Sequence, residues 1–192
     1  MSRWEPNARE RLLTAAMELY RERGFDQTTV AEIAARAGLT ERTFFRYFAD
    51  KREVLFGGSA ALQELLVQKV AGAPDGTAPM DAVAAALEAT SAVFDERRAF
   101  ARQRHALIAS HPELQERELI KLASLAAAIA EALRRRGVND PAASLASEAG
   151  IAVFKLAFER WLRDTKRRTL SAHVRDSLTA LRAVAAGKGF LR

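Results

Sequence analysis

The sequence predicts an all-α protein, and two observations support this: its alanine content and the spacing of its helix start and stop residues. Alanine, the best helix former, occurs 40 times, whereas the strand formers valine and isoleucine occur only 10 and 5 times. Glycine, proline and capping residues divide the 192 residues into about nine segments with helical periodicity. A chain of this length can also bury a sizeable core.

The first three segments are short helices with clear boundaries. We expect one from about Asn7 to Arg23, followed by a glycine. A second should begin at Thr29, because Thr29 and Glu32 have capping-box spacing, and it should end at Gly38. A third should begin at Thr40, again with threonine as the N-cap.

The fourth helix should be long, running from a second capping box at 50–53 to about Val70. It contains Gly57 and Gly58, and each glycine costs about 1 kcal/mol relative to alanine inside a helix. The pair marks either a bend between two parts of the molecule or a close contact that excludes a Cβ atom. The sequence leaves both interpretations open.

The remaining helices should cover about 79–94, 97–109, 112–136, 141–163 and 170–186. The helix expected at 141–163 is apolar over more than half of its circumference, which predicts burial on two sides. We therefore expect the last two helices to meet those of a second copy in a four-helix interface. Burial within one chain is the alternative.

Composition excludes several classes of protein. Without cysteine there is no disulfide framework and no thiol nucleophile, and three scattered histidines do not suggest a metal site. No apolar run is long enough for a membrane span, and the N-terminus lacks a signal-peptide core, so we expect a cytoplasmic protein. The net charge of +6 lies mostly in the C-terminal half, which favours polyanions without indicating the contact surface.

A two-turn helix, a glycine-containing break and a second short helix form a helix-turn-helix pattern, which leaves one face of the second helix free to enter a major groove. The run TTVAEIAARAGLTERTFFRYFADKREVL, residues 28–55, resembles the TetR family of bacterial repressors. With the first helix, the resemblance covers residues 8–55. It implies a DNA-binding domain at 1–52 and a ligand-binding and dimerisation domain at 53–192. It also implies a homodimer that binds a pseudo-palindromic, double-stranded DNA operator and responds to a small-molecule effector.

The resemblance also implies DNA-contacting residues at the start of the second helix, along the third and just beyond it: Thr28, Thr29, Thr40, Arg42, Thr43, Phe45, Tyr47 and Lys51. Arg42 is the best candidate base reader, because arginine pairs with guanine in bidentate fashion. Phe45 stands where the family usually has tyrosine, so apolar contact with a thymine methyl group could replace a phosphate contact there. As alternatives, Thr29 and Thr40 are only caps, Tyr47 is a half-buried, packed aromatic and Arg42 is a solvated charge.

The segment from Arg102 to Leu162 is similar to the C-terminal domain of the mycofactocin-cluster regulator type. This similarity implies an acyl-coenzyme A, or another large and partly apolar anion, as the effector. Four arginines between residues 97 and 104 could hold its phosphates, or could form a solvated helix face. We expect no cofactor.

The candidate pocket residues lie at inward spacings on the helices that usually surround the family's cavity: Leu66, Phe94, Phe100, Arg104, Leu107, Leu125, Phe154, Phe158 and Trp161. The alternative for each apolar residue is ordinary core packing.

These features favour a dimeric, ligand-responsive transcriptional repressor. An architectural DNA binder without a ligand is the second hypothesis, and thermal-shift screening would distinguish the two. An enzyme is disfavoured, because the Gly57-Gly58-Ser59 run lies within a predicted helix and is not a nucleophile elbow. We expect no catalytic residues.

Overall fold

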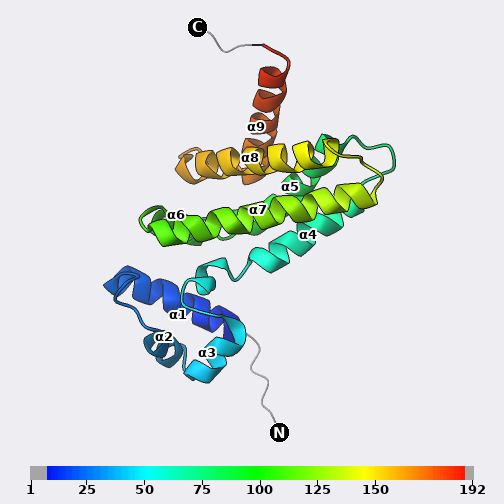
Figure 1. Ribbon diagram of the computed structural model, residues 1–192. Helices are drawn as coiled ribbons and strands as arrows, with labels where there is room; N and C mark the ends of the chain where they lie inside the picture. The colour runs from blue at the N-terminus through cyan, green and yellow to red at the C-terminus, as the bar shows by residue number, and fades with distance from the viewer. Residues whose placement is uncertain (1–7, 189–192) are drawn as a thin grey trace.

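The computed structural model describes residues 8–188, and all of its regular structure there is helical (Figure 1). This confirms the all-α prediction. The expected start at Asn7 lies outside the described residues. The helices are α1 (Ala8–Arg23), α2 (Val30–Arg36), α3 (Glu41–Tyr47), the 3₁₀ helix η1 (Glu53–Phe56), α4 (Ser59–Ala71), α5 (Pro79–Asp95), α6 (Arg98–Ala109), α7 (Pro112–Arg135), α8 (Ala142–Arg163) and α9 (Leu170–Ala185). None of these helices is long and apolar enough to cross a membrane.

Helices α1, α2 and α3 form a small head at one end of the molecule (Figure 1). Its core contains the fully buried side chains of Leu12, Ile33 and Phe44, one from each helix. Thr29 caps α2 in the predicted reciprocal capping box, and Thr40 caps α3. The local boundary signals of the head are therefore confirmed.

The prediction of one long helix from 50–53 to about Val70 is wrong for its first half. The chain forms the short η1, passes through Gly57 and Gly58, and only then begins α4. Asp50 does accept hydrogen bonds from the backbone N–H groups of Arg52 and Glu53, at 2.8 and 3.1 Å. The expected capping box is not completed, because the Glu53 carboxylate accepts hydrogen bonds from side chains of α7 instead.

Helices α4 to α9 form the larger body, in which α8 packs against α5, α7 and α9 (Figure 1). Gly150 permits the close approach of α8 to α5, since a Cβ there would lie 2.4 Å from Val83 Cγ1. The C-terminal half of α9 extends beyond the body (Figure 1).

The head and body share an apolar cluster. Residues 54–56 join the head core, and Ile108 of α6 and Leu114 of α7 are buried in the same cluster. The expected division between residues 52 and 53 thus falls inside packed structure, and α6 and α7 hold the head directly.

Candidate functional site

Helix α3 has one buried edge and one exposed face. The Phe44 ring is fully buried, whereas the adjacent Phe45 is 55% exposed, and the two rings meet edge to face at 5.5 Å. Because successive helical residues point about 100° apart, burying Phe44 turns the neighbouring side chains outward. Arg42, Phe45 and Arg46 are all exposed.

The turn before α3 depends on a glycine and on an arginine from α1. Gly38 has a φ of +66°, and a Cβ there would lie 2.8 Å from Arg11 Nη2. The Arg11 guanidinium donates to the carbonyl oxygens of Ala37 and Gly38. A left-handed residue and a cross-helix hydrogen bond therefore set the angle between α2 and α3.

The predicted residues of α3 lie together on or beside this exposed face. Thr40 is used as a cap, since its Oγ1 accepts from the Thr43 backbone N–H at 3.2 Å. Arg42 makes no polar contact with the described residues, so its guanidinium points to solvent. Arg46 donates to Tyr47 Oη at 3.1 Å and lies 4.9 Å from that ring's centroid. Our sequence prediction omitted Arg46, although its spacing from Arg42 places both on one helix face.

Two other predicted contacts face inward. Thr28 is 1% exposed and its hydroxyl donates to the Gly24 carbonyl at 2.8 Å, so it does not present its side chain to phosphate. The Lys51 ammonium donates to the carbonyls of Phe25, Asp26 and Thr28 at 2.8, 3.2 and 3.0 Å, which uses all three of its N–H bonds. Both side chains shape the loop before α2.

Thr29 remains at the surface, in the capping box. Its backbone N–H donates to Glu32 at 2.9 Å, and Arg23 donates to the same carboxylate at 2.6 Å. The hydrogen bonds from Thr29 are the main reason that the pKa of Glu32 lies below its usual value, with Arg23 adding to the effect.

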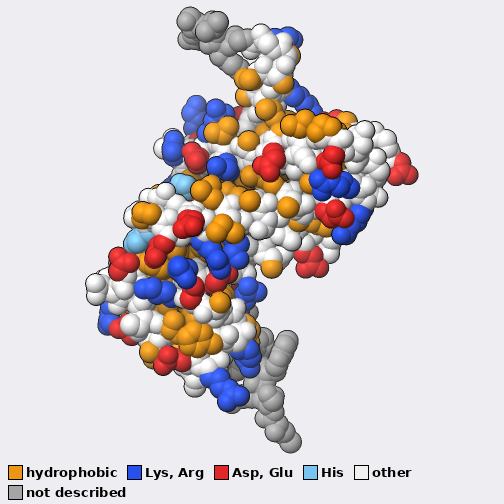
Figure 2. Space-filling model, viewed as in Figure 1, with side chains coloured by type: hydrophobic (Ala, Val, Ile, Leu, Met, Phe, Trp, Pro, Cys, Tyr) orange, Lys and Arg blue, Asp and Glu red, His pale blue; other side chains and the backbone are white. Residues whose placement is uncertain are grey.

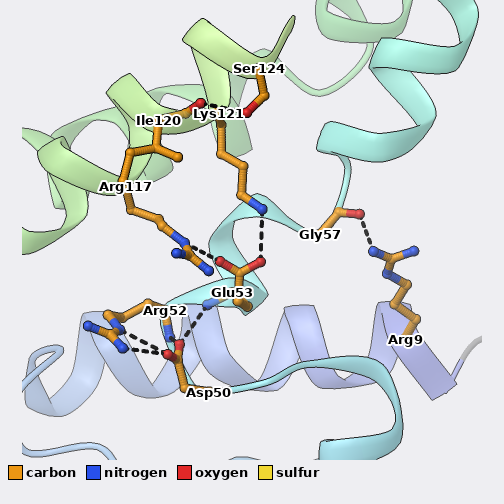
Figure 3. A network of polar contacts seen from close by, with 9 residues as sticks. All are labelled: Arg9, Asp50, Arg52, Glu53, Gly57, Arg117, Ile120, Lys121 and Ser124. Carbon is orange, nitrogen blue, oxygen red and sulfur yellow. Dashed lines mark hydrogen bonds and ion pairs between the residues drawn. The ribbon is translucent and has the colours of Figure 1, made fainter. Parts of the chain in front are cut away.

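The link between head and body is polar as well as apolar. Glu53, on η1, accepts hydrogen bonds from Arg117 and, at 3.1 Å, from Lys121, both on α7 (Figure 3). Arg9 of α1 donates to the Gly57 carbonyl on the other side of η1 (Figure 3). Cationic and anionic side chains accordingly lie next to one another on the surface where the head meets the body (Figure 2).

Three of the predicted pocket residues belong to this link. Arg104 donates to the Leu55 carbonyl at 2.7 Å and to Glu118 at 3.2 Å, and its guanidinium lies 5.0 Å from the Phe56 ring centroid. Phe100 and Leu107 pack against the head cluster. These contacts join residues that are distant in sequence, so sequence spacing alone does not predict them.

The four arginines between residues 97 and 104 all have partners within the described chain, and Arg97 and Arg102 are also exposed to solvent. Arg97 pairs with Glu10 at 3.1 Å, and Arg104 is bound as described. Arg98 donates to the carbonyls of Trp161 and Asp164, and Arg102 donates to that of Leu162 at 2.7 Å. Arg98 and Arg102 thus bind the carbonyl groups at the C-terminal end of α8, where cations are favoured.

The other predicted pocket residues do lie in the body. Leu66, Leu125 and Trp161 are buried in its core, and Phe94, Phe154 and Phe158 pack against that core while remaining partly exposed. Two surface hollows of the described part lie elsewhere. One is lined by residues of 71–79 and 135–138, and the other lies beside Gly57.

Two family models match the chain. Residues 12–56 match "Bacterial regulatory proteins, tetR family", and residues 77–186 match "MftR C-terminal domain". The second match alone covers more than half of the 192 residues.

Similar curated proteins are transcriptional regulators. The mycofactocin biosynthesis transcriptional regulator MftR of Mycobacterium tuberculosis is 31% identical over 153 residues, which is 78% of this chain and 77% of that protein. TcmR of Streptomyces glaucescens is 36% identical over 81 residues, 42% of this chain. The match spans only 36% of the length of TcmR.

Solved structures share the fold. FadR of Thermus thermophilus, a TetR family repressor in complex with lauroyl-CoA, is 27% identical, with 96% of each chain covered and a TM-score of 0.54. The complex of SmeT with triclosan is 20% identical, with 91% of each chain covered and a TM-score of 0.63. From the matched domains and the MftR relative together, the chain belongs to the tetR family of transcriptional regulators, with an MftR-type C-terminal domain, and is not an enzyme.

Proposed function

We propose that the protein is a homodimeric repressor that binds a pseudo-palindromic operator and is released by a small-molecule effector. The observation that carries the DNA-binding part is the exposed face of α3, with Phe44 anchored in the head core on the opposite edge. Two such heads would read half-sites about one duplex turn apart, roughly 34–36 Å.

On this face, we assign base reading to Arg42 and contact with a thymine methyl group to Phe45. Arg42 is exposed and has no competing polar partner among the described residues, and arginine binds guanine through two hydrogen bonds. Thr29, Thr40, Thr43 and Tyr47 flank the face and supply hydroxyl groups for phosphate contacts. We assign Thr28 and Lys51 to positioning these elements.

The surface that we assign to dimerisation is the outer side of α8 together with the end of α9. Leu145 and Leu156 are 66% and 53% exposed, and both lie on the side of α8 that faces away from the body core. Val184 of α9 is also exposed, and apolar side chains lie over α8 on the visible face of the body (Figure 2). A second copy would cover these side chains.

For the effector, we propose an acyl-coenzyme A or another large anion with an apolar part. The MftR-type domain and the lauroyl-CoA complex of the FadR relative support this class. Since an operator-binding protein acts where the chromosome is, we place the protein in the cytoplasm.

Operator selection from random duplexes, followed by binding measurements with Arg42→Ala, tests the proposal. Selection should return a pseudo-palindrome, and sedimentation equilibrium should give twice the mass of one chain. Arg42→Ala should cost about 1–3 kcal/mol and relax one base preference in each half-site. Glu41→Ala, an exposed neighbour, is the control. Unchanged operator affinity in Arg42→Ala would show that Arg42 reads no base.

A further inference from the structure

The inward side of α8 carries phenylalanines that are not fully buried. Phe154 lies two helical turns before Trp161, and Phe158 lies two turns after Ile151, so all four side chains point toward the body core. Trp161 and Ile151 are buried there, whereas Phe154 and Phe158 remain partly exposed. The inner side of α8 is therefore buried at Trp161 and Ile151 and partly exposed at Phe154 and Phe158, and it lies opposite the surface of Leu145 and Leu156.

The partly exposed rings belong to an aromatic cluster, which we define as Phe94, Phe154, Phe158 and Trp161. The Phe94 centroid lies 5.8 and 5.6 Å from those of Phe154 and Phe158, and Phe158 lies 5.5 Å from Trp161. His105 of α6 meets Phe158 edge to face at 6.2 Å. The cluster thus presents ring faces and edges from α5 and α8, beside α6.

Two N–H donors at the inner end of this cluster have no acceptor. Trp161 is 0% exposed, and its indole Nε1 makes no hydrogen bond in the described structure. The Arg98 guanidinium lies 5.1 Å from the Trp161 ring, and its Nε is likewise buried and unpartnered. Its Nη2 is fixed by the carbonyls of Trp161 and Asp164. Buried polar groups are nearly always hydrogen-bonded, so two adjacent unpaired donors indicate a missing acceptor.

We propose that the aromatic cluster binds a planar aromatic group that carries an oxygen acceptor, such as a carboxylate or carbonyl. The rings of Phe94, Phe154 and Phe158 would stack on its faces and edges. Its oxygen would accept from Trp161 Nε1 and Arg98 Nε, and the arginine charge favours an anion. This inference rests on the proposed ligand response and specifies which part of the effector enters the body.

Three probes with nine carbons each test the ring and the acceptor separately: 4-ethylbenzoate, nonanoate and 4-ethyltoluene. Trp4→Phe leaves Trp161 as the sole tryptophan, so its fluorescence reports binding at the cluster. We expect 4-ethylbenzoate to change Trp161 emission and to bind at least about tenfold more tightly than nonanoate or 4-ethyltoluene. Equal or tighter binding of nonanoate would overturn the proposal.

Variants then test the named residues by calorimetry. Trp161→Phe removes the donor but keeps a ring, and should weaken 4-ethylbenzoate about tenfold while leaving 4-ethyltoluene unchanged. Phe154→Leu, at a partly exposed position, should weaken both aromatic probes and leave nonanoate unchanged. Val93→Ala, at an exposed position next to Phe94, is the control and should bind all three probes like the parent protein. If neither cluster variant alters probe binding, the site lies elsewhere.

The same samples separate this inference from the proposed function. If 4-ethylbenzoate binds as expected but operator affinity does not respond to it, the aromatic site stands and the proposed ligand response to this class fails. If operator binding and dimerisation are intact but no aromatic preference is found, the proposed repressor stands and the aromatic site is rejected.

Discussion

The head and the body differ in how completely their own residues satisfy their buried polar groups. Within residues 8–52, every buried side-chain nitrogen and oxygen has a hydrogen-bond partner. In the described part of the body, Arg98 Nε, Trp161 Nε1 and Ser177 Oγ have none. The buried polar side chains of the head are thus all paired, whereas the body retains unpaired polar atoms in its interior.

The largest expected effect compares a fully buried ring of the head with a partly exposed ring of the body. Phe44→Ala removes a fully buried ring and should lower the free energy of unfolding by about 3–5 kcal/mol, measured by urea denaturation. Phe154→Ala removes a partly exposed ring of the body and should cost less than half as much. Similar losses in the two variants would show that the Phe154 ring contributes as much to stability as the fully buried Phe44 ring.

A smaller effect is expected at the link between the two regions. Glu53 has a side chain that is 17% exposed and binds both Arg117 and Lys121. Glu53→Gln should lower the free energy of unfolding by roughly 1 kcal/mol, because both cations lose their anion but are themselves partly solvated. Glu131→Gln removes a more exposed carboxylate, which pairs with Arg134 and Arg135 in the last turn of α7. This substitution should change the free energy of unfolding less. The reverse order would show that the link adds no stability.

The two adjacent glycines of the link should respond in opposite directions. A Cβ on Gly57 would lie 3.0 Å from Phe48 Cε1, whereas a Cβ on Gly58 would have no neighbour within 4 Å. Gly57→Ala should therefore lower the melting temperature, and Gly58→Ala should leave it unchanged or raise it, each by an amount equivalent to about 1 kcal/mol or less. Equal effects would mean that the close packing at Gly57 is unimportant.

The smallest effect concerns pH and the capping box of α2. The folded pKa of Glu32 lies below its usual value of 4.5, mainly because Thr29 donates hydrogen bonds to the carboxylate. The stabilisation is therefore complete above pH 4.5 and is lost as the pH falls through the lower, folded pKa. Thermal unfolding should show Glu32→Gln as the less stable protein at neutral pH, with the difference vanishing in acid. A difference that persists in acid would exclude this origin.

The sequence predicted those features that depend on neighbouring residues. The caps at Thr29 and Thr40 and the ends of the short helices follow from local rules, and the structure has them. The same rules led to the wrong prediction that a long helix begins at 50–53. The partners of Glu53 lie on α7, which is distant in sequence, so local rules could not include them. Contacts of this kind leave no local signal.

The division of the candidate pocket was unpredictable for the same reason. Phe100 and Phe154 are both partly buried phenylalanines on amphipathic helices, but one packs against the head and the other against the body core. Likewise, Lys51 has the surroundings of an exposed cation in sequence, and only the folded loop brings three carbonyl groups to it. Residue type predicted the chemistry of these side chains, but not their partners.

The attachment of α3 has an evolutionary consequence. Its angle is set by Gly38 and by Arg11 on another helix, and neither belongs to the outward-facing residues of α3. Substitutions at Arg42 or Phe45 therefore leave unchanged the two features that set the angle of α3, so the proposed recognition surface can vary without altering them.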